Sequence, residues 1–116
     1  MTLRKKETQQ IIRGTTPTFI INVLDDIDLS EVVSVWIYIV QKKVEVLREI
    51  PDVVFDFEKR TMAVTFNQND TLGLKEGEAK FQIRILIDDG SDLKKALATV
   101  AQDIEILEIY KEGVIT

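Results

Sequence analysis

Alternation of apolar and polar residues over Glu78–Asp88 is the feature that most constrains the fold of this chain. One face of this segment is entirely apolar and consists of Ala79, Phe81, Ile83, Ile85 and Ile87. The other face has Leu86 as its one apolar residue, and its polar side chains include Lys80, Gln82, Arg84 and Asp88. Because successive side chains of a strand point to opposite sides of the sheet, the pattern predicts a strand with one buried and one solvated face.

A second strand is predicted over Val32–Gln41, where both faces are apolar. Val33, Val35, Ile37 and Ile39 share one face, and Trp36, Tyr38 and Val40 share the other. Such a strand is expected at the centre of a sheet or beneath another element. We interpret Trp36, the single tryptophan, as a core anchor, since buried aromatic residues usually pack. A chain of 116 residues need not cover the whole of this face, so Trp36 and Tyr38 are also candidate interaction residues.

Weaker strand signals fill most of the remaining chain, between turn-forming residues. These segments are Gln10–Arg13, Thr18–Leu24, Val44–Arg48, Val53–Phe57 and Met62–Phe66. A succession of short strands and turns is typical of a β-sandwich or a β-barrel. The polar stretch Asn67–Leu74 predicts a short turn, or a single helical turn, that connects two sheets.

The apolar residues of segment 93–107 fit both the spacing of a helix and the alternation of a strand. Leu93, Leu97, Val100, Ile104 and Leu107 recur at helical spacing, whereas Ala96, Ala98, Val100, Ile104 and Ile106 share one face of a strand. Periodicity slightly favours the helix. Asp89–Gly90, however, is typical of a hairpin turn, which would return the chain antiparallel to the preceding strand. We therefore expect a strand here.

The composition argues against an enzyme. The chain has no His and no Cys, which removes the commonest catalytic base, the Cys nucleophile, disulfides and nearly all zinc or iron–sulfur sites. Its serines lie in no recognisable nucleophile motif. The aspartates of 25–28 and 88–92 are interpreted as turn formers, because neither run has the pattern of a calcium loop. We expect no catalytic residue, no metal and no cofactor.

Charge and hydropathy limit the partners. With 15 Lys and Arg against 20 Asp and Glu, the net charge is -5, which disfavours binding to nucleic acid. No apolar run reaches the ~20 residues that span a bilayer, and no signal-peptide core follows the first basic residues. We expect no nucleic-acid partner, no membrane partner and no secretion signal. Residues 1–9, with Arg4, Lys5 and Lys6, are expected to form a flexible basic arm, or else to dock on an acidic neighbouring subunit.

The segment Arg13-Gly14-Thr15-Thr16-Pro17-Thr18 opens the first long strand. Gly14 permits a sharp turn, Pro17 disfavours a helix, and Arg13 is expected to pair with a nearby carboxylate. This RGTTPT segment is similar to the amino-terminal signature of small β-sandwich proteins encoded by phages and prophages of gut Firmicutes. Further segments resemble that family in the same order, namely Asn67–Leu72, Phe81–Leu86, Asp89–Gly90, Thr99–Leu107 and Gly113–Ile115.

The resemblance implies an all-β fold: an immunoglobulin-like antiparallel β-sandwich of about seven to eight strands over residues 10–108, followed by a tail at 109–116. It also implies a structural or assembly protein without enzymatic activity, associated with a phage tail or baseplate. Its partners would be other phage structural proteins or further copies of itself, in the virion or in the host cytoplasm during assembly. Open sheet edges of such a protein can accept a strand from a neighbour. The alternative is a carbohydrate- or protein-binding module on the same scaffold, which exposed aromatic residues would favour.

Overall fold

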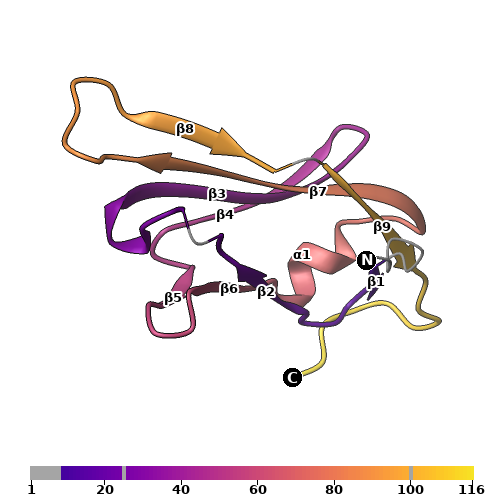
Figure 1. Cartoon of the computed structure of the whole chain (residues 1–116). Coiled ribbons are helices and arrows are strands. Elements are labelled where there is room, and N and C mark those ends of the chain that lie inside the picture. Colours follow the sequence, from indigo (N-terminus) through magenta and orange to yellow (C-terminus); the bar gives the residue numbers. More distant parts are fainter. Residues whose placement is uncertain (1–8, 25, 100) are drawn as a thin grey trace, which may run out of the picture.

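The structure is a computed structural model that describes residues 9–24, 26–99 and 101–116. These residues form two β-sheets packed face to face, as Figure 1 shows from the side. The larger sheet has the order β1 (Gln9–Ile12), β9 (Gln102–Leu107), β7 (Gly77–Ile87), β3 (Val32–Gln41) and β4 (Val44–Glu49), and β8 (Lys95–Ala98) also pairs with β7. The smaller sheet has the order β2 (Thr18–Asn22), β6 (Thr61–Thr65) and β5 (Val54–Asp56). The predicted all-β sandwich is therefore confirmed.

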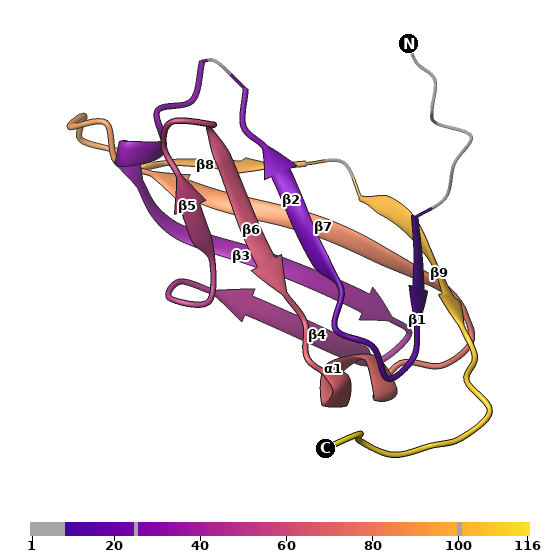
Figure 2. The same ribbon diagram turned by 90° about the horizontal axis from the view of Figure 1, so that it is seen from below.

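The strand order follows the immunoglobulin arrangement. The smaller sheet, β2-β6-β5, corresponds to strands B-E-D, and β9-β7-β3-β4 corresponds to G-F-C-C′ of the variable type. Figure 2 shows the smaller sheet lying across the larger one. Two details differ from the expectation. The described residues form nine strands, because the segment after the β7–β8 turn is divided into β8 and β9. The larger sheet is mixed, because β1 runs parallel to β9, from Gln9 opposite Ile104 to Ile12 opposite Leu107.

The core lies between the inner faces of β3 and β7 and the smaller sheet. Ile37 lies opposite Ile83, and Ile39 opposite Phe81, so that the alternating apolar residues of both strands are buried together. From the smaller sheet, Phe19 stacks on Phe81 with ring centroids 4.7 Å apart. Val33, in contrast, is 49% exposed although the alternation assigned it to the buried face. A register shift between Val32 and Ser34 turns it outward.

A short helix, α1 (Gln68–Leu72), carries the chain from β6 in the smaller sheet to β7 in the larger one, as predicted. Asn67 caps this helix. Its side chain accepts a hydrogen bond from the Asp70 amide, and the Asp70 carboxylate accepts one from the Asn67 amide, each 2.8 Å long. A 3-10 turn at Leu29–Glu31 precedes β3, and the buried Leu29 side chain joins the core.

Truncation of a core residue tests this account of stability. Ile37 is fully buried between the sheets. Ile37→Ala is therefore expected to lower the free energy of unfolding by about 2–5 kcal/mol. Val54, on β5, is 67% exposed and provides the matched control. Val54→Ala should change the stability by no more than about 0.5 kcal/mol. Chemical denaturation followed by circular dichroism measures both. Equal effects of the two variants would contradict the assignment of the core.

Candidate protein interaction surface

The outer face of the larger, six-stranded sheet is left uncovered by the two-layer fold within the described residues. The smaller sheet and α1 both lie on the other side of that sheet (Figure 1). Residues directly opposite one another on neighbouring strands share a face, so the register determines which side chains gather here. Three rows across β4, β3 and β7 form the middle of this face.

We name the residues of these rows the outer patch. In the first row, Trp36 lies between Glu49 and Arg84; in the second, Tyr38 lies between Leu47 and Gln82; in the third, Val40 lies between Glu45 and Lys80. The β4 side of the patch is therefore acidic, the β7 side is basic, and the middle is apolar or aromatic. The sequence alone proposes only Trp36 and Tyr38 for this surface. The polar face of the β7 pattern contains Lys80 and Arg84, but their cross-strand neighbours depend on a register that alternation does not give.

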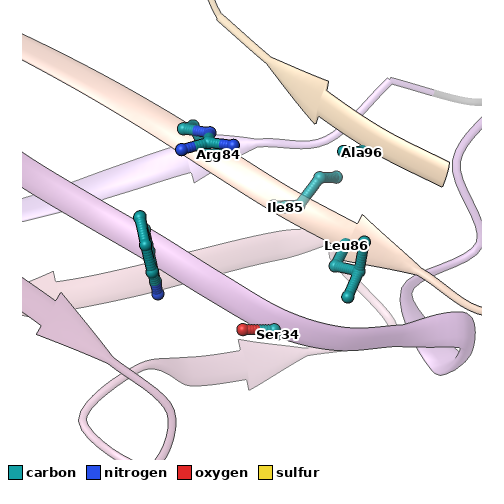
Figure 3. A pocket seen from close by; sticks show the side chains of 6 residues that line it. Ser34, Arg84, Ile85, Leu86 and Ala96 are labelled. Carbon is teal, nitrogen blue, oxygen red and sulfur yellow. The ribbon is translucent and has the colours of Figure 1, made fainter. Parts of the chain in front are cut away.

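Trp36 is 42% exposed, so its interpretation as a core anchor is wrong. It lies on the face opposite to the buried Val35 and Ile37, and within the described residues no element covers that face. The Arg84 guanidinium carbon lies 5.2 Å from the centre of the Trp36 ring, which is a cation–π contact. Beside this pair is a shallow hollow of about 170 Å³. Figure 3 shows Ser34, Arg84, Leu86 and Ala96 around it.

Hydrogen bonds along the face hold part of the patch in place. The half-buried Tyr38 donates its hydroxyl proton to Gln82 Oε1, and Gln82 Nε2 donates to the Thr99 carbonyl at 2.7 Å. Lys80 donates to the Asp103 carboxylate on β9, a contact that raises the pKa of Lys80. Glu45, Glu49 and Arg84, in contrast, form no ion pair with another described residue. Two carboxylates on one side of the patch and one guanidinium on the other therefore remain available to a partner.

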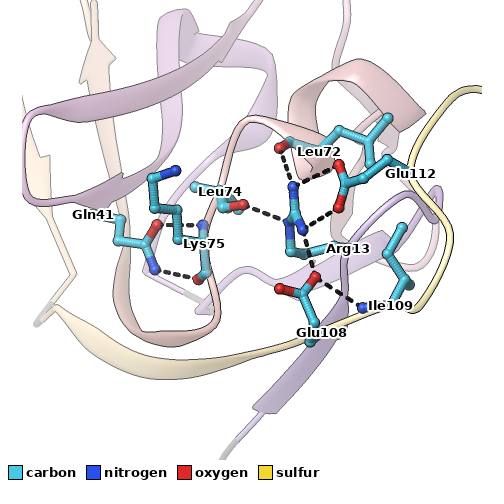
Figure 4. Close-up of polar contacts among 8 residues, drawn as sticks. All are labelled: Arg13, Gln41, Leu72, Leu74, Lys75, Glu108, Ile109 and Glu112. Atoms are coloured by element: carbon cyan, nitrogen blue, oxygen red, sulfur yellow. Dashed lines mark hydrogen bonds and ion pairs between the residues drawn. The ribbon is translucent and has the colours of Figure 1, made fainter.

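Arg13, the first residue of the RGTTPT segment, fastens the carboxyl-terminal tail to the sandwich. Its Nε donates to the Leu74 carbonyl at 2.7 Å, and its Nη2 donates to the Leu72 carbonyl at 2.9 Å. Its guanidinium also forms ion pairs with Glu108 and, at 2.6 Å, with Glu112. The expected pairing of Arg13 with a carboxylate is therefore confirmed, and Figure 4 shows these contacts converging on one guanidinium.

The other signature residues carry the chain from β1 in one sheet to β2 in the other. Gly14 has a φ of +78°, and a Cβ there would lie 3.3 Å from Ile109 Cδ1. The Thr15 hydroxyl donates to the Ile12 carbonyl at 2.6 Å, and the Pro17 carbonyl accepts from the Phe66 amide at 3.0 Å. Thr16 is exposed. Contacts of this kind build a crossover and present no reactive group. Arg4, Lys5 and Lys6 lie outside the described residues.

Two acidic residues of the loops, Asp28 and Asp89, stabilise turns. Asp28 accepts hydrogen bonds from the Ser30 amide and hydroxyl, and Asp89 accepts the same pair from Ser91. The hydrogen bond from the Ser91 hydroxyl contributes most to lowering the pKa of Asp89 to about 2, and the Ser91 amide and Lys95 lower it further.

Over the described ranges, no group of three or more acidic side chains is placed to hold a metal ion. No helix within those ranges is long and apolar enough to span a bilayer.

The Arg13 contacts predict an acid-sensitive tail. Hydrogen bonds from Arg13 and from the Ile109 amide lower the pKa of Glu108, so its charged form is the one that the fold stabilises. This contribution is present above the ordinary pKa of a glutamate and is lost as the pH falls through the lowered value. Carboxyl titration by NMR should place the pKa of Glu108 below its ordinary value of 4.5, and the protection of the Ile109 amide from exchange, taken relative to the intrinsic rate at each pH, should fall on acidification. In Glu108→Gln, whose neutral amide oxygen is a weaker acceptor than a carboxylate, the protection of the Ile109 amide should be reduced at neutral pH as well. A glutamate that titrates normally would contradict the prediction.

Comparisons with protein-family models, with curated proteins and with solved structures found no match for this chain.

Proposed function

We propose that this chain is a non-enzymatic structural or assembly protein that acts through protein–protein contacts, with the outer patch as its contact surface. The exposed Trp36 side chain carries this proposal. Tryptophan, tyrosine and arginine dominate the binding energy of protein interfaces, and the patch places Trp36, Tyr38 and Arg84 side by side. Charged residues border this aromatic centre, an arrangement that resembles the polar rim of a protein interface.

The proposed setting is the tail or baseplate of a phage or prophage particle. The resemblance of the signature that begins at Arg13 supports this setting. The contacts of Arg13 offer a physical reason for such a signature: one guanidinium holds the crossover, the loop after α1 and the tail together.

Particle composition tests the setting. Particles induced from a host strain that carries the gene should contain this chain at a constant ratio to the tail proteins, measured by quantitative mass spectrometry. In a strain that carries Trp36→Lys, the amount in particles should fall at least about tenfold, because a buried, unpaired charge is costly in an interface. Ile20→Lys is the matched control: Ile20 is 67% exposed on the smaller sheet, outside the patch. A chain that is abundant in lysate and missing from particles would contradict the proposal.

A second candidate is a carbohydrate-binding module, favoured by the exposed Trp36 ring beside a hollow with the polar residues Ser34 and Arg84. Arg84 already lies over the ring, however, where a sugar would stack, so we place this function second. NMR titration of the protein with a panel of oligosaccharides distinguishes the two. Saturable shifts confined to the hollow, and abolished in Trp36→Ala, would favour the module.

A further inference from the structure

We propose that the outer patch binds the outer patch of a second copy of this chain, through a two-fold axis parallel to β3. This inference rests on the proposed function, in which the patch is a contact surface, and it names the partner and the arrangement. The distribution of charge across the three strands carries it.

The patch is divided into an acidic and a basic side along the direction of its strands. Glu45 and Glu49 lie on β4, and Lys80 and Arg84 lie on β7, with β3 between them. Adjacent strands are about 4.8 Å apart, so the two charged rows are separated by roughly 10 Å on one surface. A surface divided in this way is complementary to a copy of itself that is turned over about the line between the rows.

That line runs along β3. A two-fold axis in the interface plane and parallel to β3 places the β4 row of one copy over the β7 row of the other. Glu49 then faces Arg84 of the second copy, and Glu45 faces Lys80 of the second copy. Each of these contacts occurs twice, because the axis generates every contact in duplicate.

The other in-plane axis, across the strands, gives the reverse result. It places each β4 row over the β4 row of the second copy, so that Glu49 meets Glu45, and Arg84 likewise meets Lys80. Like charges in contact across an interface are strongly unfavourable. The charge pattern therefore favours the axis parallel to β3. With this axis the opposite charges face one another without a shift of one copy along the strands.

The same axis also places the apolar middle of one patch over the apolar middle of the other. Trp36 and Tyr38 of one copy lie over the same residues of the other, in the aligned packing at about -30° that twisted sheets adopt. The stacking of Arg84 on Trp36 would be covered, and the hollow beside it would be closed by the second copy. Of the two cross-copy ion pairs, Glu49 with Arg84 is expected to be the stronger, because Asp103 already holds Lys80.

Charge exchange tests this arrangement directly. Sedimentation velocity of the full chain over a range of concentrations should show a monomer–dimer equilibrium. Glu49→Arg alone and Arg84→Glu alone should each weaken the dimer by about tenfold or more, and the double variant should restore it to within about threefold. Glu58→Arg and Lys94→Glu, two exposed positions outside the patch, are the matched controls and should leave the dimer unchanged. Circular dichroism confirms that every variant is folded.

Three results would overturn the inference. The first is a wild-type chain that stays monomeric at every concentration tested. The second is a stronger dimer in Glu49→Arg, which would indicate the axis across the strands. The third is a folded double variant whose dimer is as weak as that of the single variants. The proposed function is tested separately from the dimer. If the chain is monomeric but still enters particles through Trp36, the proposed function stands and the second copy is excluded as the partner.

Discussion

The pairing of β3 with β7 is the constraint on which the rest of the structure depends. These are the two longest strands, and their inner residues, among them Ile37, Ile39 and Phe81, supply the centre of the core. Since side chains alternate along a strand, burying one face also determines what the other face presents. A slip of one residue would bring Lys80 and Arg84 into the core and Ile83 into water. The exposed position of Trp36 is thus a consequence of the register that makes the core.

Polar contacts close the end of the sandwich at which α1 lies. Two of the crossovers between the sheets, at 13–17 and at α1, are joined where the Thr71 hydroxyl donates to the Thr15 carbonyl at 2.9 Å. Arg48 on β4 forms an ion pair with Asp70 of α1 and lies 5.4 Å from the centre of the Phe66 ring. Gln41 binds both the amide and the carbonyl of Lys75. These contacts satisfy backbone groups at the place where the chain leaves one sheet for the other, and so they hold the loops there.

The sequence pattern of neighbouring residues was sufficient to predict where the long strands begin and end. The strand expected over Val32–Gln41 has those bounds, and the one expected over Glu78–Asp88 runs over Gly77–Ile87. The ambiguous segment 93–107 forms strand and not helix, as the hairpin turn before it indicated, but it contains two strands, β8 and β9. The division between β8 and β9 was not foreseen. It coincides with Thr99, whose amide and hydroxyl both bond to the backbone of Ile83, and only the folded partner strand supplies that contact.

The errors concern contacts between distant parts of the chain. Trp36 has the apolar neighbours of a core residue, but it lies on the outer face of the larger sheet, and the sequence does not reveal that no described element covers that face. The parallel pairing of Gln9 with Ile104 joins segments far apart in the sequence, which no short pattern encodes. For the outer patch, the carboxylates on β4 reach their places through a two-residue turn in which Lys42 adopts a φ of 54°. Asparagine or glycine is the usual marker of such a turn, and neither is present here.

The parallel pairing of β1 with β9 has a mechanical consequence. β1 begins at the amino-terminal side and β9 leads to the carboxyl-terminal side, so tension applied between the two sides pulls these neighbouring strands in opposite directions along their length. All the hydrogen bonds between Gln9–Ile12 and Ile104–Leu107 would then bear the load together rather than opening one by one. Before that load reaches them, it must break the contact of Arg13 with Glu112. The hydrogen bonds of this strand pair would therefore be loaded in shear.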